Sequence, residues 1–387
     1  MSALELTLPS SARAQGVSSL VGLVAAALLV LHTRYTGQAL MPSYLFVWLF
    51  LLGLSLGALA LIFVHNLTGG DWGAQVRPVL EPLVRMLPYC ALLAIPMLVQ
   101  LPALYSWMRS GDVAPLDVEP SQTWYLNSTF FWTRWVLYFA IWIVFGFLVR
   151  NRSSARTWSA TTPPGASVHA ASAVGLFLYL ITATFSSIDW TMSLTPRWVS
   201  TEFGLLIGTG QCLSALAFAI VASTWFARIE PGNLSARFHD LGNLLLALVL
   251  IWSYLAFMQF IIMWIEDLPH DISWYLPRTR EGWGRLTFLL ACIHFAVPFL
   301  LLLSRAFKRT PKALRWLAAL LLLASLTDAF WLVIPAFRPQ RFELQWNDLL
   351  ALLGVGGIWL GLFMRAVRRS AGDATAMPTG DPEVHHA

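Results

Sequence analysis

Charged residues and cysteines are both scarce in this sequence, and each scarcity narrows the class of protein. Charged residues make up 12% of the 387 positions, whereas soluble domains carry about a quarter. This composition excludes an ordinary soluble enzyme. The three cysteines, Cys90, Cys212 and Cys292, form no C-x-x-C and no C-x-x-C-H pattern. The chain alone therefore cannot supply an iron–sulfur site or a c-type haem site.

The sequence also lacks the short motifs of nucleotide binding and hydrolysis. It contains no Walker sequence, no G-x-G-x-x-G and no G-x-S-x-G nucleophile elbow. A haem held by two histidines needs a facing pair at membrane depth, and only His294 lies well inside an apolar run. We therefore expect that this chain alone binds no metal and no cofactor.

Long apolar runs are the dominant feature of what is present. Hydrophobic residues make up 57% of the chain, and the mean hydropathy is +0.65. Runs of roughly 20 apolar residues, enough to cross the hydrocarbon core of a bilayer, recur along the sequence. Backbone polar groups in lipid must be paired internally, and the runs show no alternation, so we expect helices. The ten runs cover about 17–32, 43–65, 86–107, 128–149, 168–188, 203–226, 241–264, 284–304, 313–336 and 346–364.

These runs predict an all-α polytopic membrane protein with one domain. We expect a cytoplasmic tail at 1–14, a ten-helix transmembrane domain at 15–369 and a disordered cytoplasmic tail at 370–387. The first run has no A-x-A-like cleavage site close behind it, which indicates a retained helix. Glycines four residues apart predict close helix packing. They are Gly53 and Gly57, Gly204 and Gly208, and Gly357 and Gly361.

The distribution of Lys and Arg predicts the orientation. If each run crosses once, about twice as many lie in the termini and even-numbered loops as on the opposite side. Arg77 and Arg85, in the expected second loop, and the basic stretch 305–315 belong to the richer side. Both termini are therefore expected in the cytoplasm. The net charge of +5 then reflects membrane orientation rather than binding of nucleic acid.

The stretch SSIDWTMSLTPRWVSTEFG at 186–204 falls in the outer connection between the fifth and sixth helices. Trp190 and Trp198 fit the aromatic belt at a membrane interface. Pro196 ends any helical continuation. Glu202 fits two interpretations: a favourable charge beside the N-terminus of the next helix, or a member of a polar site.

A polar series leads along the fifth helix to a carboxylate. Tyr179, Thr182, Ser186 and Asp189 fall within about 80° of helical arc, on one face. Hydroxyl groups that lead to a carboxylate suit a proton path or a polar ligand pocket. The alternative is that the small hydroxyls hydrogen-bond neighbouring helices together.

Other ionisable residues lie inside the apolar runs, where such residues are functional candidates. His294 lies near the middle of the eighth helix, Asp328 in the outer part of the ninth, and Arg134 near the start of the fourth. Arg134 also fits a side chain that snorkels to the interface, and His294 a structural histidine. We expect Asp189, His294 and Asp328 to handle protons. Four outer groups are expected near the mouth of the route: Glu202, Glu266, Asp267 and His270.

Three segments resemble a known family. They are HNLTGGDWG (65–73), the stretch at 186–204, and DLGNLLLALVLIWSYLAFMQFIIMWIEDLPHD (240–271). They resemble the NrfD-like membrane subunits of alternative complex III, a bacterial quinol:cytochrome c oxidoreductase, and most closely the second of its two ten-helix subunits. The resemblance covers most of the chain. It implies two four-helix bundles plus peripheral helices, in the bacterial inner (cytoplasmic) membrane.

The resemblance also implies a function within a complex. The chain would contribute to quinol binding or proton translocation without being catalytic by itself, with quinone or quinol as its ligand. The expected partners are membrane lipids, a sister NrfD-like subunit, a multihaem cytochrome c subunit, an iron–sulfur subunit and, as a further candidate, a terminal oxidase. Haem c and iron–sulfur clusters would lie in those partners. In this family the better-supported quinol pocket lies in the sister subunit.

Two other functions stay open. One is the NrfD-type anchor of another quinone-linked enzyme, such as a polysulfide reductase-like molybdoenzyme. The other is a secondary transporter, a class with interrupted helices at matching positions in two halves. Pro88, Pro96 and Pro102 interrupt the third helix without a counterpart in the other half.

Overall fold

The computed structural model describes residues 11–109, 122–152, 165–226, 234–269 and 272–376. Over these residues the chain is helical, with no strand. Ten helical segments in the described part are long and apolar enough to cross a membrane. This confirms an all-α polytopic membrane protein. The spans are Ala12–Thr36, Met41–Thr68, Gln75–Val99, Ser128–Val149, Ala166–Leu194, Phe203–Thr224, Leu234–Glu266, Trp283–Leu303, Pro311–Ala336 and Trp346–Ser370.

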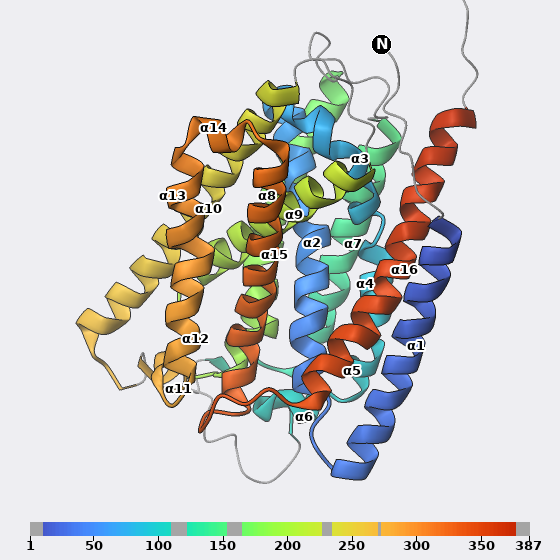
Figure 1. Ribbon diagram of the computed structural model, residues 1–387. Helices are drawn as coiled ribbons and strands as arrows, with labels where there is room; N and C mark the ends of the chain where they lie inside the picture. The colour runs from blue at the N-terminus through green and yellow to red at the C-terminus, as the bar shows by residue number, and fades with distance from the viewer. Residues whose placement is uncertain (1–10, 110–121, 153–164, 227–233, 270–271, 377–387) are drawn as a thin grey trace, which may run out of the picture.

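Figure 1 shows the order and arrangement of the described elements. They are α1 (Ser11–Thr36), α2 (Met41–Thr68), α3 (Trp72–Val84), α4 (Leu87–Leu93), α5 (Ile95–Val99), α6 (Leu101–Leu104), η1 (Ser106–Met108), α7 (Ser128–Arg152), α8 (Ala166–Trp190), η3 (Met192–Leu194), α9 (Phe203–Phe226), α10 (Leu234–Glu266), η4 (Ile272–Trp274), α11 (Tyr275–Thr279), α12 (Trp283–Leu290), η5 (Ala291–Ala296), α13 (Val297–Leu303), α14 (Arg305–Lys308), α15 (Pro311–Val333), η6 (Ile334–Ala336) and α16 (Trp346–Ala376).

The third span is broken into short helices, as its prolines predict. Pro88, Pro96 and Pro102 each stand in the first two positions of a new helix, α4, α5 and α6 respectively. Proline lacks an N–H and fixes φ, so it is tolerated at a helix start and interrupts a helix interior. The prediction that Arg77 lies in a loop is wrong, because this residue belongs to α3, which begins at Trp72.

Helices α2 and α9 lie at the centre of the molecule and pack against each other (Figure 1). Helices α3, α4 and α8 contact α2, and α7 packs on α4 and α8. Helices α10 and α15 contact α9, and α12 and α13 pack beside them. The spans from α2 to α8 are called the first bundle below, and the spans from α9 to α15 the second bundle. Helices α1 and α16 pair with each other along the edge of the first bundle.

Glycines allow the close helix contacts that their spacing predicts. A Cβ atom on Gly57 of α2 would collide with the backbone of Gln211 on α9. A Cβ on Gly204 would lie 2.6 Å from Thr184 of α8, and one on Gly357 of α16 would lie 2.8 Å from the Cα of Gly22 on α1. Backbones therefore approach closely at the central contact and at the peripheral pair.

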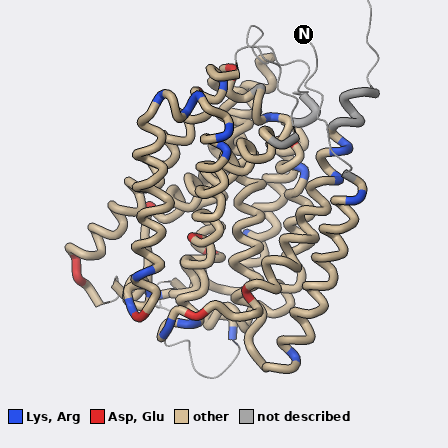
Figure 2. The backbone as a smooth tube through the Cα atoms, viewed as in Figure 1, with Lys and Arg blue, Asp and Glu red and all other residues tan. Residues whose placement is uncertain are grey.

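The start of α1, the short helix α14 and the end of α16 lie at the same end of the bundle (Figure 1). Lys and Arg gather at the two ends, and the middle holds few charges (Figure 2). Helix α1 begins at Ser11 and α16 continues to Ala376, so both expected tails are partly helical. Residues 1–10 and 377–387 lie outside the described part.

Candidate functional site

Arg134 of α7 and Asp189 of α8 form a buried ion pair in the first bundle. Arg134 Nε donates to Asp189 Oδ2 at 2.9 Å, and Arg134 Nη2 donates to Asp189 Oδ1 at 2.6 Å. Tyr138 donates its hydroxyl to Oδ2 at 2.8 Å. The two charged residues are 5% and 1% exposed. The interpretation that Arg134 snorkels to the interface is wrong, because Asp189 holds it inside the bundle.

The rest of the Arg134 guanidinium is also satisfied. Nη1 donates to the carbonyl of Tyr125 at 3.1 Å, and the group lies 3.8 Å from the centre of the Tyr125 ring and 4.3 Å from that of Phe130. Burial raises the pKa of Tyr125, with the charge of Asp189 acting in the same direction. Ser193 donates to the carbonyl of Asp189 at 2.6 Å. The pair therefore has the hydrogen bonds that a buried ion pair needs to be stable.

Both tryptophans of the 186–204 stretch lie in the core, so the expected aromatic belt at these positions is wrong. Trp190 and Trp198 are 2% and 0% exposed. The Trp190 ring packs edge-on against Trp48 with centroids 5.0 Å apart. Trp198 stacks on Trp274 with centroids 4.5 Å apart and an interplanar angle of 14°. The 186–204 stretch therefore turns inward, and these rings pack inside the bundles at this connection.

The polar series of α8 is buried, as expected for one inward face, but its members have different partners. Thr182 and Ser186 donate to carbonyls of their own helix, and Thr182 also accepts from Trp142 Nε1 at 2.8 Å. These two hydroxyls fit the interpretation of hydrogen bonding within and between helices. Tyr179 differs, because its hydroxyl donates to Gln211 Oε1 of α9 at 2.9 Å.

Gln211 lines a small cavity at the junction of the two bundles, whose wall is mostly apolar with several polar residues. The cavity measures about 70 Å³ and lies between α2, the start of α9, η5 and α15. Its polar lining residues are Thr191, Gln211, Ser214, His294, Ser325 and Asp328. Two of the three residues expected to handle protons, His294 and Asp328, therefore face the same space. Asp189 does not line it, although Thr191, two residues later, does.

His294 is buried without a hydrogen-bond partner. It is 1% exposed, and neither Nδ1 nor Nε2 has a partner among the described residues. Its ring lies against Trp252 of α10, with centroids 3.9 Å apart. His294 belongs to η5, a π-helical turn at Ala291–Ala296 within the eighth span. Such turns interrupt the regular α-helix and are frequent at functional sites.

Asp328 lines the same cavity from α15 and is half-buried. Within the described part of the chain its carboxylate has no hydrogen bond and no ion pair. The nearby cation is Arg278 of α11, which is 1% exposed and donates to the carbonyls of Trp274, Trp331 and Leu332. Burial lowers the pKa of Arg278 to about 9, and the charges of Tyr275 and Asp328 act against this shift. Asp328 therefore experiences a positive charge without a direct contact to it.

Glu202 immediately precedes α9, the first helix of the second bundle. Its Oε1 atom is buried without a hydrogen-bond partner among the described residues, and burial raises its pKa. Burial raises the pKa of Tyr275 to about 12, and the charge of Glu202 acts in the same direction. The Tyr275 hydroxyl accepts from Gln259 Nε2 at 3.2 Å. Polar groups thus continue from Glu202 toward Arg278 and Asp328.

The residues expected near the mouth of the proton route do not meet the cavity in the described structure. Glu266 and Asp267 are exposed at the end of α10, where Asp267 has a positive φ of 46°. The structure describes no contact between them and the cavity residues. His270 lies outside the described residues.

Sequence reasoning missed three polar residues of the cavity, Thr191, Ser214 and Ser325. Ser325 lies three residues before Asp328 on the same helix, a spacing that places both on one face. This spacing can be read from the sequence, so Ser325 could have been predicted as a neighbour of Asp328. Thr191 follows the end of α8, so its orientation depends on how the chain turns there.

The HNLTGGDWG segment forms a second polar network. Arg77 Nη1 donates to Asn66 Oδ1 at 3.2 Å and lies 3.3 Å from His65 Nδ1. Asn66 Nδ2 donates to Ser172 of α8 at 3.0 Å, and a Cβ on Gly73 would collide with the His65 ring. The segment thus joins α2, α3 and α8, which is a structural role.

Across the described residues there is no group of three or more His, Cys, Asp and Glu side chains that could hold a metal ion. No protein-family model matches the chain, and no curated protein matches it.

Proposed function

We propose that this membrane protein is an NrfD-like subunit of a bacterial quinol:cytochrome c oxidoreductase, and that its His294–Asp328 cavity takes up and passes protons. The observation that carries the proposal is that two titratable residues without a hydrogen-bond partner among the described residues, the buried His294 and the half-buried Asp328, line one small cavity. Buried polar groups are nearly always hydrogen-bonded, so a buried histidine with neither ring nitrogen bonded calls for an explanation. Carboxylate and imidazole groups are also the usual proton carriers in membrane proteins.

The size of the cavity favours protons and water over quinol at this place. A water molecule occupies about 30 Å³ of liquid and needs two to four polar partners. The cavity of about 70 Å³ therefore suits a few water molecules, and six of its lining residues are polar. Pockets for small-molecule ligands measure roughly 300–1,000 Å³. In the proposed complex, quinol would bind elsewhere, in contact with the sister subunit.

The order of the polar groups gives the proposed route. From the outer end it runs through Glu202 and Tyr275 to Asp328 and His294. Gln211 and Tyr179 continue from the cavity into the first bundle. Bound water in the cavity would bridge the groups that do not touch directly.

Asp189 has a positioning role in this proposal. Its carboxylate is occupied by Arg134 and Tyr138, so it is not free to exchange protons. The ion pair fixes the end of α8, from which Thr191 reaches the cavity wall. This differs from the expected role of Asp189 as a proton carrier.

Oxidation of a quinol releases two electrons and two protons. In the proposed complex this chain would carry the protons and its partner subunits the electrons. Haem and iron–sulfur groups in partner subunits would accept the electrons. The transporter alternative is less well supported, because transporters have interrupted helices at matching positions in both halves. The eighth span, in the second half, stays helical through η5. Only the third span is broken into separate helices within the described part.

Purification tests membership of a complex. A tagged copy of the chain, extracted from its native membranes in mild detergent, should migrate with a multihaem cytochrome and an iron–sulfur subunit, identified by haem staining and mass spectrometry. An unrelated tagged multi-span protein from the same membranes is the control. Migration with a molybdenum-containing subunit would favour the polysulfide reductase-like alternative. Migration of the chain alone would contradict both.

A further inference from the structure

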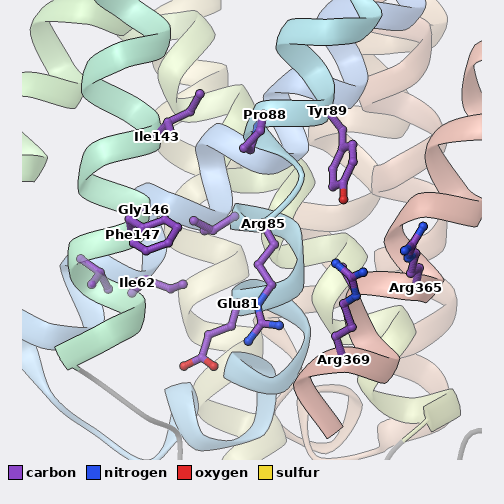
Figure 3. A pocket seen from close by; sticks show the side chains of 13 residues that line it. Ile62, Glu81, Arg85, Pro88, Tyr89, Ile143, Gly146, Phe147, Arg365 and Arg369 are labelled. Atoms are coloured by element: carbon purple, nitrogen blue, oxygen red, sulfur yellow. The ribbon is translucent and has the colours of Figure 1, made fainter. Parts of the chain in front are cut away.

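A second pocket lies at the end of the bundle that holds α14 and the end of α16. It measures about 220 Å³ and is formed by α3, α4, α7 and α16 (Figure 3). Its wall on α7 is apolar and includes Ile143, Gly146 and Phe147. Figure 3 shows three arginines around the opposite side: Arg85, which directly follows α3, and Arg365 and Arg369 of α16. The pocket therefore combines an apolar wall with concentrated positive charge.

The charge on α16 is not balanced inside the protein. Arg365 and Arg369 are exposed and make no hydrogen bond or ion pair with any described residue. They stand four residues apart on one helix face, an arrangement in which like charges destabilise the helix. The one acidic residue of the pocket is Glu81, whose Oε1 already accepts from Arg77 Nε at 2.8 Å. An anion in the pocket would offset the repulsion.

The pocket also lies where the apolar surface of the bundle begins. Arg365 and Arg369 belong to the last turns of the tenth span, and Arg85 to the third. Phe147 and Val144 of α7 are each 53% exposed and continue the apolar wall along the outside of the bundle. The Tyr89 hydroxyl points into the space beside the arginines (Figure 3).

We propose that this pocket binds the phosphodiester headgroup of an anionic phospholipid. The guanidinium groups of Arg85, Arg365 and Arg369 hold the phosphate, and the acyl chains lie along α7. Guanidinium groups match phosphate oxygens in geometry and charge. Basic pockets between transmembrane helices bind anionic lipid headgroups in this way. A soluble anion would leave the apolar wall uncovered.

The test measures lipid binding to the purified protein in lipid nanodiscs or detergent, by native mass spectrometry. The ligands are phosphatidylglycerol, phosphatidylcholine with the same acyl chains, and inorganic phosphate. The wild-type protein should retain phosphatidylglycerol in preference to phosphatidylcholine. The double variant Arg365→Gln, Arg369→Gln should bind phosphatidylglycerol roughly thirtyfold more weakly, since each basic residue near a membrane surface contributes about 1 kcal/mol.

The matched control is the double variant Arg305→Gln, Arg309→Gln, which removes two exposed arginines four residues apart at the same end of the bundle. It should bind phosphatidylglycerol as the wild-type protein does. The variant Arg365→Lys, Arg369→Lys keeps the charge and should retain most of the binding. Equal losses in the glutamine variant and the control would overturn the proposal, as would no loss in either. Binding of inorganic phosphate with no preference for phosphatidylglycerol would also overturn it.

Discussion

Replacing Asp189 by asparagine tests whether its ion pair with Arg134 stabilises the first bundle. The carboxylate is 1% exposed and accepts three hydrogen bonds, two from Arg134 and one from Tyr138. Asparagine keeps the shape and one acceptor oxygen but loses the negative charge. Arg134, 5% exposed, would then be a buried cation without its counter-ion.

The structure sets the size of the expected effect. Removing one partner of a buried ion pair costs about 3–5 kcal/mol, because the other charge stays buried. Arg134 keeps its bond to the Tyr125 carbonyl and its two aromatic neighbours, so part of its stabilisation remains. We therefore expect Asp189→Asn to lower the free energy of unfolding by about 3 kcal/mol, the lower end of that range.

The assay is unfolding by SDS in mixed micelles, followed by tryptophan fluorescence. The matched control is Asp328→Asn, the same substitution at a carboxylate without a partner in the described structure. We expect it to change the free energy of unfolding by less than about 1 kcal/mol, since no hydrogen bond is lost. Equal destabilisation by the two variants would refute the distinction between a structural and a proton-exchanging carboxylate.

Three further predictions concern packing, topology and cofactors. Gly57→Ala should destabilise the protein by about 1–3 kcal/mol because its Cβ would collide with the backbone of α9, whereas Gly356→Ala, whose nearest neighbour is 4.0 Å away, should not. Single cysteines introduced at Arg309 and Leu344 should react with a membrane-impermeant reagent from opposite sides, and labelling of both from outside the cell would contradict the ten-span topology. The polypeptide purified without partners should show no haem or iron–sulfur absorbance, and a stoichiometric Soret band would contradict this.

Much of the fold could be predicted because a bilayer leaves few options for a backbone. Ten apolar runs predict ten spans, and Pro88, Pro96 and Pro102 predict the breaks in the third. The first turns of that span are not predicted, because the expected apolar run begins only near residue 86 and leaves Arg77 in the loop before it. In the structure Arg77 Nε donates to Glu81 within α3, so the charges pair inside the helix.

The candidate site was predicted less completely. The apolar runs show which ionisable residues lie at membrane depth, so His294 and Asp328 could be selected as candidates from the sequence. Which groups face each other depends on helix rotation and on the path of the connections. The pairing of Arg134 with Asp189 and the burial of Trp198 arise from contacts between helices distant in the sequence. A single sequence contains no direct signal for such contacts.

The central claim is that the cavity of His294 and Asp328 handles protons for a quinol-oxidising complex. Asp328→Asn in the assembled complex tests it most directly, with quinol oxidation and proton release measured together, and with the exposed Asp240→Asn as the control. A positioned proton-transferring group contributes about 10²–10⁴-fold to a rate. The account predicts full assembly, with quinol oxidation slowed at least tenfold or proton release abolished. A fully assembled Asp328→Asn complex with normal turnover and normal proton release would contradict it.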